Sequence, residues 1–82
     1  MPDTEWSYED DALVRDFQFP DFKAAMWFVN QVAELAEKRN HHPDILVHGW
    51  NNVRLTLSTH SEGGLTDADH ALARGIDEVI GG

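Results

Sequence analysis

The chain has 82 residues, too few for more than one domain, and we expect a single domain spanning residues 1–82. Its net charge of −9 disfavours nucleic acids and anionic membranes as partners, and its lack of cysteine excludes disulfides, thiolate metal sites and a thiol nucleophile. With no apolar run near the roughly 20 residues of a membrane span and no signal-peptide pattern, a cytoplasmic location is expected.

Two segments near the N-terminus have the alternation that is typical of β-strands. Residues 5–9 carry two aromatic side chains, and residues 12–19 place Phe17 and Phe19 on one face. The two aspartates between these segments are a turn signal. We therefore predict a β-hairpin at this end of the chain.

The pattern changes to a helical period after Pro20. Asp21 is a candidate N-cap, because its carboxylate can accept hydrogen bonds from the first helical turn. Pro43 disfavours helical geometry in the residue before it, so the helix should end near Asn40. The expected apolar stripe consists of Phe22, Met26, Val29, Ala33 and Ala36, widened by Trp27, Phe28, Val32 and Leu35. One small sheet cannot cover so wide a stripe, and we expect a homodimer or homotetramer.

The second half of the chain repeats the arrangement. Residues 45–50 and 53–59 are predicted strands, joined by a two-residue turn at Asn51-Asn52. Thr66 and Asp69 then form the T-x-x-D pattern of a helix N-terminus. The helix that follows should bury Leu72, Ala73, Ile76 and Val79 or Ile80.

The resulting element order is β-β-α-β-β-α. Two hairpins that are each followed by a helix predict an α+β fold. In this fold a four-stranded antiparallel sheet carries both helices on one face.

Three of the five histidines fall at the ends of predicted elements. His41 and His42 follow the long helix, and His60 ends the fourth strand. Imidazole exchanges protons near neutral pH, so such a cluster favours general acid–base catalysis. Simpler interpretations stay open: a histidine at a helix C-terminus can merely complement the helix dipole, a strand-end histidine can merely be exposed, and capping alone explains Asp69.

Zinc binding is the competing interpretation of the histidines. Three histidines and a carboxylate can hold this ion. Adjacent histidines are poor ligands for one ion, however, and the i, i+4 spacing of a helical zinc motif is missing. We therefore expect no metal, and we expect His48 and His70 to be surface residues.

Several linked motifs carry a resemblance to a known family. Residues 37–44 read Glu-Lys-Arg-Asn-His-His-Pro-Asp, residues 50–53 read Trp-Asn-Asn-Val, and residues 55–60 read Leu-Thr-Leu-Ser-Thr-His. With Gly-Gly-Leu-Thr at 63–66 and Asp69, they resemble the pterin-4a-carbinolamine dehydratase family. The resemblance covers about residues 17–79, and the N-H-H-P and T-H-x-x-G-G-L-T motifs are specific when they occur together.

The sequence departs from the family pattern in two places, and neither contains a histidine of the motifs. Both are expected to affect the rim of the substrate pocket. The chain starts almost at the first strand, without the additional helix with which the family usually begins. The segment before Val53 is one residue longer than usual and has Trp50 where Tyr is common. A bulge near His48 and Gly49 is expected to absorb the extra residue.

The resemblance implies a metal-free lyase without a cofactor, acting in tetrahydrobiopterin recycling. It removes water from a 4a-hydroxytetrahydropterin and gives a quinonoid dihydropterin. By resemblance, the catalytic residues are His41, His42 and His60, and the substrate-binding residues are Asp69, Glu37, Trp50, Ser58 and Thr59. Asp69 is a candidate either for orienting a histidine or for holding the pterin. The resemblance leaves open which histidine is the acid. It also keeps an alternative, a non-catalytic protein-interaction, assembly or transcriptional-coactivator module of the same fold.

Overall fold

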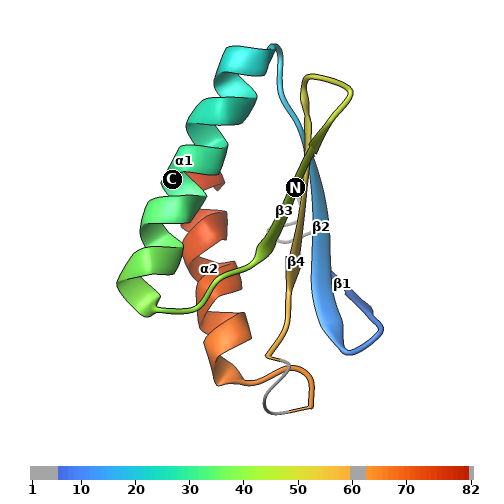
Figure 1. The fold of residues 1–82 in the computed structure, drawn as a ribbon, viewed down its shortest axis with the longest axis vertical. Coiled ribbons are helices and arrows are strands. Elements are labelled where there is room, and N and C mark those ends of the chain that lie inside the picture. Colours follow the sequence, from blue (N-terminus) through green and yellow to red (C-terminus); the bar gives the residue numbers. More distant parts are fainter. Residues whose placement is uncertain (1–5, 60–62, 82) are drawn as a thin grey trace.

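The elements follow one another in the predicted order, β-β-α-β-β-α (Figure 1). The computed structural model describes residues 6–59 and 63–81. The strands are β1 (Ser7–Glu9), β2 (Ala12–Gln18), β3 (Asp44–His48) and β4 (Asn52–Leu57), and the helices are α1 (Phe22–Arg39) and α2 (Asp67–Gly81). In the described part of the chain, neither helix is long and apolar enough to cross a membrane.

All four strands pair antiparallel in the spatial order β1-β2-β4-β3. The central pair joins β2 to β4, from Leu13 opposite Leu57 to Gln18 opposite Asn52. Both helices lie on the same side of this sheet (Figure 1). The predicted α+β fold is therefore confirmed.

The core lies between the sheet and the helices. Strand β4 contributes the fully buried Val53, Leu55 and Leu57, which the strand's alternation predicted to share one face. The largest buried side chain is Phe28 of α1, whose ring centroid lies 4.6 Å from that of Phe17. This aromatic contact joins the long helix to β2.

The predicted apolar stripe of α1 is correct for Phe28, Val32 and Ala36 but wrong for Phe22 and Trp27. The buried residues are Ala25, Phe28, Val32 and Ala36, whereas Phe22 and Trp27 are each 53% exposed. The stripe is centred on Phe28 because this ring packs against both Phe17 and Phe19. Periodicity alone could not choose between neighbouring stripes on a helix this apolar.

Helix α2 buries the predicted face and lies close to α1. Leu72, Ala73 and Ile76 are buried, whereas Ile80 is 40% exposed. A Cβ atom at Gly75 would come within 2.8 Å of Leu35 Cδ2, so the absence of a side chain there allows the helices to approach.

The turn between β3 and β4 covers residues 49–51, instead of the predicted residues 51–52. Positive φ angles occur at Gly49 and Trp50, and Asn52 is already paired with His48 in the ladder. Asn51 is held at the end of β2, because its Nδ2 donates to the carbonyl of Phe19 at 2.8 Å. The β3–β4 register is continuous from Asp44 to His48, so the predicted bulge does not interrupt this ladder.

Candidate active site

The end of α1 fixes the backbone of His41. Asn40 has a left-handed conformation with φ of 51°, and the N–H of His41 donates to the carbonyl of Ala36 at 3.0 Å. A hydrogen bond across five residues of this kind is the Schellman arrangement that ends many helices. It reverses the direction of the chain at the C-terminal end of α1, here called the foot of α1, which lies near the start of α2 (Figure 1).

Asp69 of α2 meets His41 in the interior. Asp69 Oδ1 lies 2.5 Å from His41 Nε2, and the exposed fraction of the aspartate side chain is 0%. The second carboxylate oxygen, Oδ2, accepts from Thr59 Oγ1 at 2.7 Å and from the N–H of Thr66 at 3.1 Å. The carboxylate thus joins the end of α1, the second residue after β4 and the start of α2.

The environment of Asp69 favours its ionised form. Burial by itself raises the pKa of this carboxyl, but the hydrogen bonds from His41, Thr59 and the Thr66 N–H outweigh it. The pKa of Asp69 therefore lies below its ordinary value. An ionised carboxylate at this position can hold one imidazole in a fixed orientation.

The predicted T-x-x-D capping pattern forms only in part. Asp69 accepts from the backbone of Thr66, as in a capping box. The Thr66 hydroxyl, however, lies 3.0 Å from Thr59 Oγ1 instead of capping α2. Asp69 therefore has two roles, one at the helix terminus and one beside His41.

The ends of the loop before α2 are held together. Thr59 and Gly64 exchange two backbone hydrogen bonds, each 3.1 Å long. The predicted catalytic residue His60 lies between them, outside the described residues. Its place beside His41 and His42 stays a prediction.

His42 makes a separate contact at the surface. Its Nε2 lies 2.6 Å from Glu37 Oε2, and the two side chains are 56% and 76% exposed. Both predicted residues are thus at the foot of α1. The pair is open to solvent, where a substrate can reach it.

Trp50 lies apart from the Asp69–His41 pair, whereas Ser58 precedes Thr59, which donates to Asp69. Trp50 is 61% exposed in the β3–β4 turn, separated from the foot of α1 by the length of β3, roughly 13 Å. Ser58 lines a hollow of about 290 Å³ together with outward-facing residues of the sheet such as Arg54 and Thr56. To bind substrate as predicted, Trp50 and Ser58 would need a further protein surface beside them, in addition to the Asp69–His41 pair.

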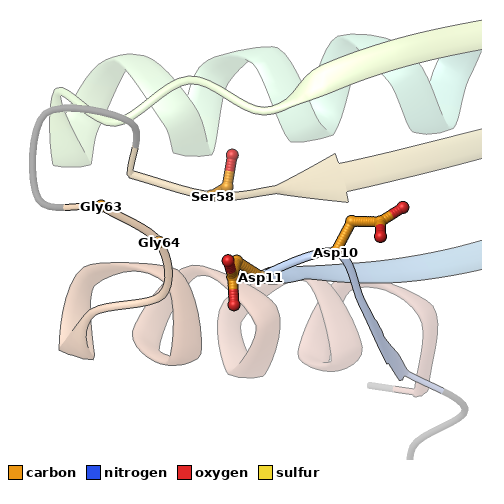
Figure 2. A pocket seen from close by; sticks show the side chains of 5 residues that line it. All are labelled: Asp10, Asp11, Ser58, Gly63 and Gly64. Atoms are coloured by element: carbon orange, nitrogen blue, oxygen red, sulfur yellow. The ribbon is translucent and has the colours of Figure 1, made fainter.

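A second hollow adjoins the first at the β1–β2 turn. Its volume is about 260 Å³, and its lining consists of Asp10, Asp11, Ser58, Gly63 and Gly64 (Figure 2). Among the described residues, neither His41 nor His42 lines either hollow. No group of three His, Cys, Asp or Glu side chains suited to a metal ion occurs within residues 6–59 and 63–81.

Comparison with known proteins shows the family to which the motifs and the fold correspond. The family model for pterin 4 alpha carbinolamine dehydratase matches residues 1–79. The chain belongs to this family. A family member from Chloroflexus aurantiacus, provisionally named pterin-4-alpha-carbinolamine dehydratase, is 52% identical over 77 residues, which cover 94% of this chain and 82% of that protein. One from Thermomicrobium roseum with the same provisional name is 53% identical over 74 residues, 90% of this chain and 78% of that protein.

Two solved structures have the same fold. A transcriptional coactivator/pterin dehydratase from Brucella melitensis superposes with a TM-score of 0.83 at 41% identity, covering 90% of this chain and 80% of that chain. A pterin dehydratase-like protein identified as a RuBisCO assembly factor in the alpha-carboxysome superposes with a TM-score of 0.73 at 26% identity, covering 94% and 88%. The family fold thus occurs in proteins described by different roles.

Sequence reasoning missed the part played by Thr66. From the sequence alone, capping of the last helix explained both Thr66 and Asp69. The signal that was available is the second threonine, Thr59, next to His60 in the same family motif. Only the tertiary structure brings the Thr59 hydroxyl to the Asp69 carboxylate and the Thr66 hydroxyl to that of Thr59.

Proposed function

We propose that the protein dehydrates a 4a-hydroxytetrahydropterin to a quinonoid dihydropterin by histidine general acid–base catalysis. The observation that carries the proposal is the buried Asp69 carboxylate on His41 Nε2 at 2.5 Å. A fully buried carboxylate that holds an imidazole is a common arrangement where a histidine transfers protons. The exposed His42 lies next to it in the chain, at the same end of α1.

The reaction asks only for proton transfers. The hydroxyl at C4a must leave as water and needs a proton donor, while a ring N–H must lose a proton to an acceptor. Positioned imidazoles meet both needs, and general acid–base catalysis typically contributes about 10² to 10⁴ in rate. We assign the catalytic roles to His41, His42 and His60, and substrate contacts to Glu37, Trp50, Ser58 and Thr59. Of the two roles expected for Asp69, we assign the orientation of a histidine, because its side chain is 0% exposed.

The proposal extends to the setting of the reaction. The enzyme works without a metal or cofactor, in tetrahydrobiopterin recycling in the cytoplasm, as one domain that forms a homodimer or homotetramer. A homo-oligomer would also provide the additional surface that Trp50 and Ser58 require to contribute to a site.

Alanine substitution of His60 tests the catalytic assignment. Turnover of a 4a-hydroxypterin generated in situ should fall at least about tenfold, the scale of a lost acid–base group. His48→Ala and His70→Ala are the matched controls, because both side chains are exposed outside the proposed site. Unchanged turnover in the His41, His42 and His60 triple alanine variant would refute the proposed activity.

A second candidate is a non-catalytic role as an assembly factor or transcriptional coactivator. The observation that favours it is the fold shared with the Brucella coactivator and with the RuBisCO assembly factor. The same triple variant separates the candidates, because an interaction module needs no acid–base set. A protein without dehydratase activity that still binds a macromolecular partner would favour this role.

A further inference from the structure

The directions of the hydrogen bonds around Asp69 can be assigned from the donors available. The carboxyl is fully buried, and its lowered pKa keeps it ionised near neutral pH. An ionised carboxylate only accepts hydrogen bonds. His41 Nε2, 2.5 Å from Oδ1, must therefore carry a proton and donate it.

The threonine hydroxyls form a chain with one direction. Thr59 Oγ1 donates its single proton to Asp69 Oδ2 at 2.7 Å. It can only accept from Thr66 Oγ1, 3.0 Å away, so the Thr66 hydroxyl is the donor in that contact. Asp69 Oδ2 also accepts from the backbone N–H of Thr66, which can never act as an acceptor.

Because Nε2 of His41 donates to Asp69, the state of the other ring nitrogen, Nδ1, is determined as well. A neutral imidazole with its proton on Nε2 has its lone pair on Nδ1. We propose that Asp69, held by Thr59 and Thr66, is a positioning residue that fixes His41 in the Nε2–H tautomer, so that Nδ1 is the atom that exchanges a proton with the substrate. This inference rests on the proposed function, which makes His41 a catalytic residue.

The arrangement predicts what an amide in place of the carboxylate would do. In the Asp69→Asn variant, the position of Oδ2 still receives two donors, one of them the obligate N–H of Thr66. The amide oxygen is expected there, which turns the amide NH₂ toward His41 Nε2. A donating NH₂ requires Nε2 to accept, so the ring should change to the Nδ1–H tautomer.

Nitrogen-15 NMR of the neutral imidazole and steady-state kinetics test this together. Wild-type His41 should show protonated Nε2, and Asp69→Asn should show protonated Nδ1 with kcat lower by about 10² to 10⁴ and KM changed by less than about threefold. Asp16→Asn is the matched control, because Asp16 is an exposed carboxylate paired with Arg54 on the outer face of the sheet. It should leave the tautomer and kcat unchanged.

Thr59 variants provide an independent measurement should Asp69→Asn not fold. Thr59→Val removes one donor to Asp69 and should lower kcat by about threefold to tenfold, and Thr59→Ser should restore most of the loss because it keeps the hydroxyl. A wild-type ring protonated on Nδ1 would overturn the proposal. So would an Asp69→Asn variant with unchanged tautomer and kcat, which is the outcome expected for a carboxylate that only caps α2.

The proposed function can fail separately. Suppose that the wild-type protein lacks dehydratase activity, while His41 is protonated on Nε2 and changes tautomer in Asp69→Asn. The positioning of His41 by Asp69 would then be supported, and the dehydratase assignment would be refuted.

Discussion

Glu37 Oε2 lies 2.6 Å from His42 Nε2 at the surface, repeating the contact that Asp69 makes with His41 in the interior. The two contacts have almost the same length but different surroundings. The Glu37 side chain is 76% exposed, whereas that of Asp69 is 0% exposed. Solvent screens the first pair, and a buried carboxylate that loses its partners has no water to replace them. The two pairs should therefore contribute very different free energies to folding.

Stability measurements on two variants test this difference. Glu37→Gln should change the free energy of unfolding by less than about 0.5 kcal/mol, as for exposed ion pairs. Asp69→Ala should lower it by about 2–4 kcal/mol, because it leaves the partly buried Thr66 N–H and His41 Nε2–H without this acceptor. Urea unfolding measures both values, and losses of equal size would contradict the structure.

The lowered pKa of Asp69 predicts a loss of stability in acid. The unfolded chain has the ordinary aspartate pKa of about 3.9, so it takes up this proton before the folded protein does. The stabilisation is fully present above that value and is lost as the pH falls through the lower folded pKa. Urea midpoints recorded between about pH 7 and pH 2 should show this loss, and Asp69→Asn should remove it.

Asp16 gives the control for the acid titration. The hydrogen bond from Arg54 lowers the pKa of this carboxyl as well. The pair is exposed on the outer face of the sheet, so solvent screening makes its contribution small. Asp16→Asn should therefore leave most of the acid dependence in place, and a larger effect than that of Asp69→Asn would rule out Asp69 as its main source.

The sequence predicts this fold well wherever one face of an element is buried. The alternation of Val53, Leu55 and Leu57 gave the inward face of β4, because a strand has only two faces. Helix α1 has apolar residues on several neighbouring stripes, and packing against Phe17 and Phe19 decided which one is buried. The β3–β4 turn depended on long-range pairing too, because Asn51 is bonded to Phe19, 32 residues away.

Three of the predicted site residues come together in the structure, through contacts that the sequence could not predict. The linked motifs singled out His41, Thr59 and Asp69, and the structure brings all three together. The spacing could not show that Asp69 reaches across 28 residues to His41, since its capping pattern already explained it locally. Contacts between the ends of distant elements depend on how the helices pack, which a single sequence does not encode in any local pattern.

A second, partly buried network connects the sheet with α2. Asp77 Oδ1 accepts from Arg15 Nη1 and from Trp6 Nε1, each at 2.8 Å. The Arg15 side chain is only 12% exposed, so Asp77→Ala would leave a largely buried guanidinium without this partner. We expect Asp77→Ala to lower the free energy of unfolding by about 2–4 kcal/mol.

A double-mutant cycle separates the ion pair from other effects of that substitution. Arg15→Met together with Asp77→Ala should cost less than the sum of the single variants, with a coupling energy of about 1–3 kcal/mol. Urea unfolding of the four proteins gives this value. Additive losses would show that the two side chains stabilise the fold independently.

The final prediction concerns the oligomeric state. The excess apolar surface expected on α1 is smaller than the sequence suggested, because Phe28 and Val32 are buried in the core. Trp27 remains 53% exposed on α1, and Leu46 is 52% exposed on the edge strand β3. Large apolar side chains at the surface and an unpaired strand edge both favour association. Light scattering at micromolar concentration should therefore give two or four times the chain mass of 9.3 kDa.

Two single variants locate the association surface. Trp27→Glu should lower the measured mass if copies meet through α1, and Leu46→Glu should do so if they meet beside β3, because each places a charge where apolar surface would be buried. Gln18→Glu controls for the added charge alone, since Gln18 is an exposed polar residue at the end of β2. A mass near 9.3 kDa for the wild-type protein would refute the homo-oligomer. It would also remove the surface through which Trp50 could take part in a site with His41, since the two lie at opposite ends of β3 within one copy.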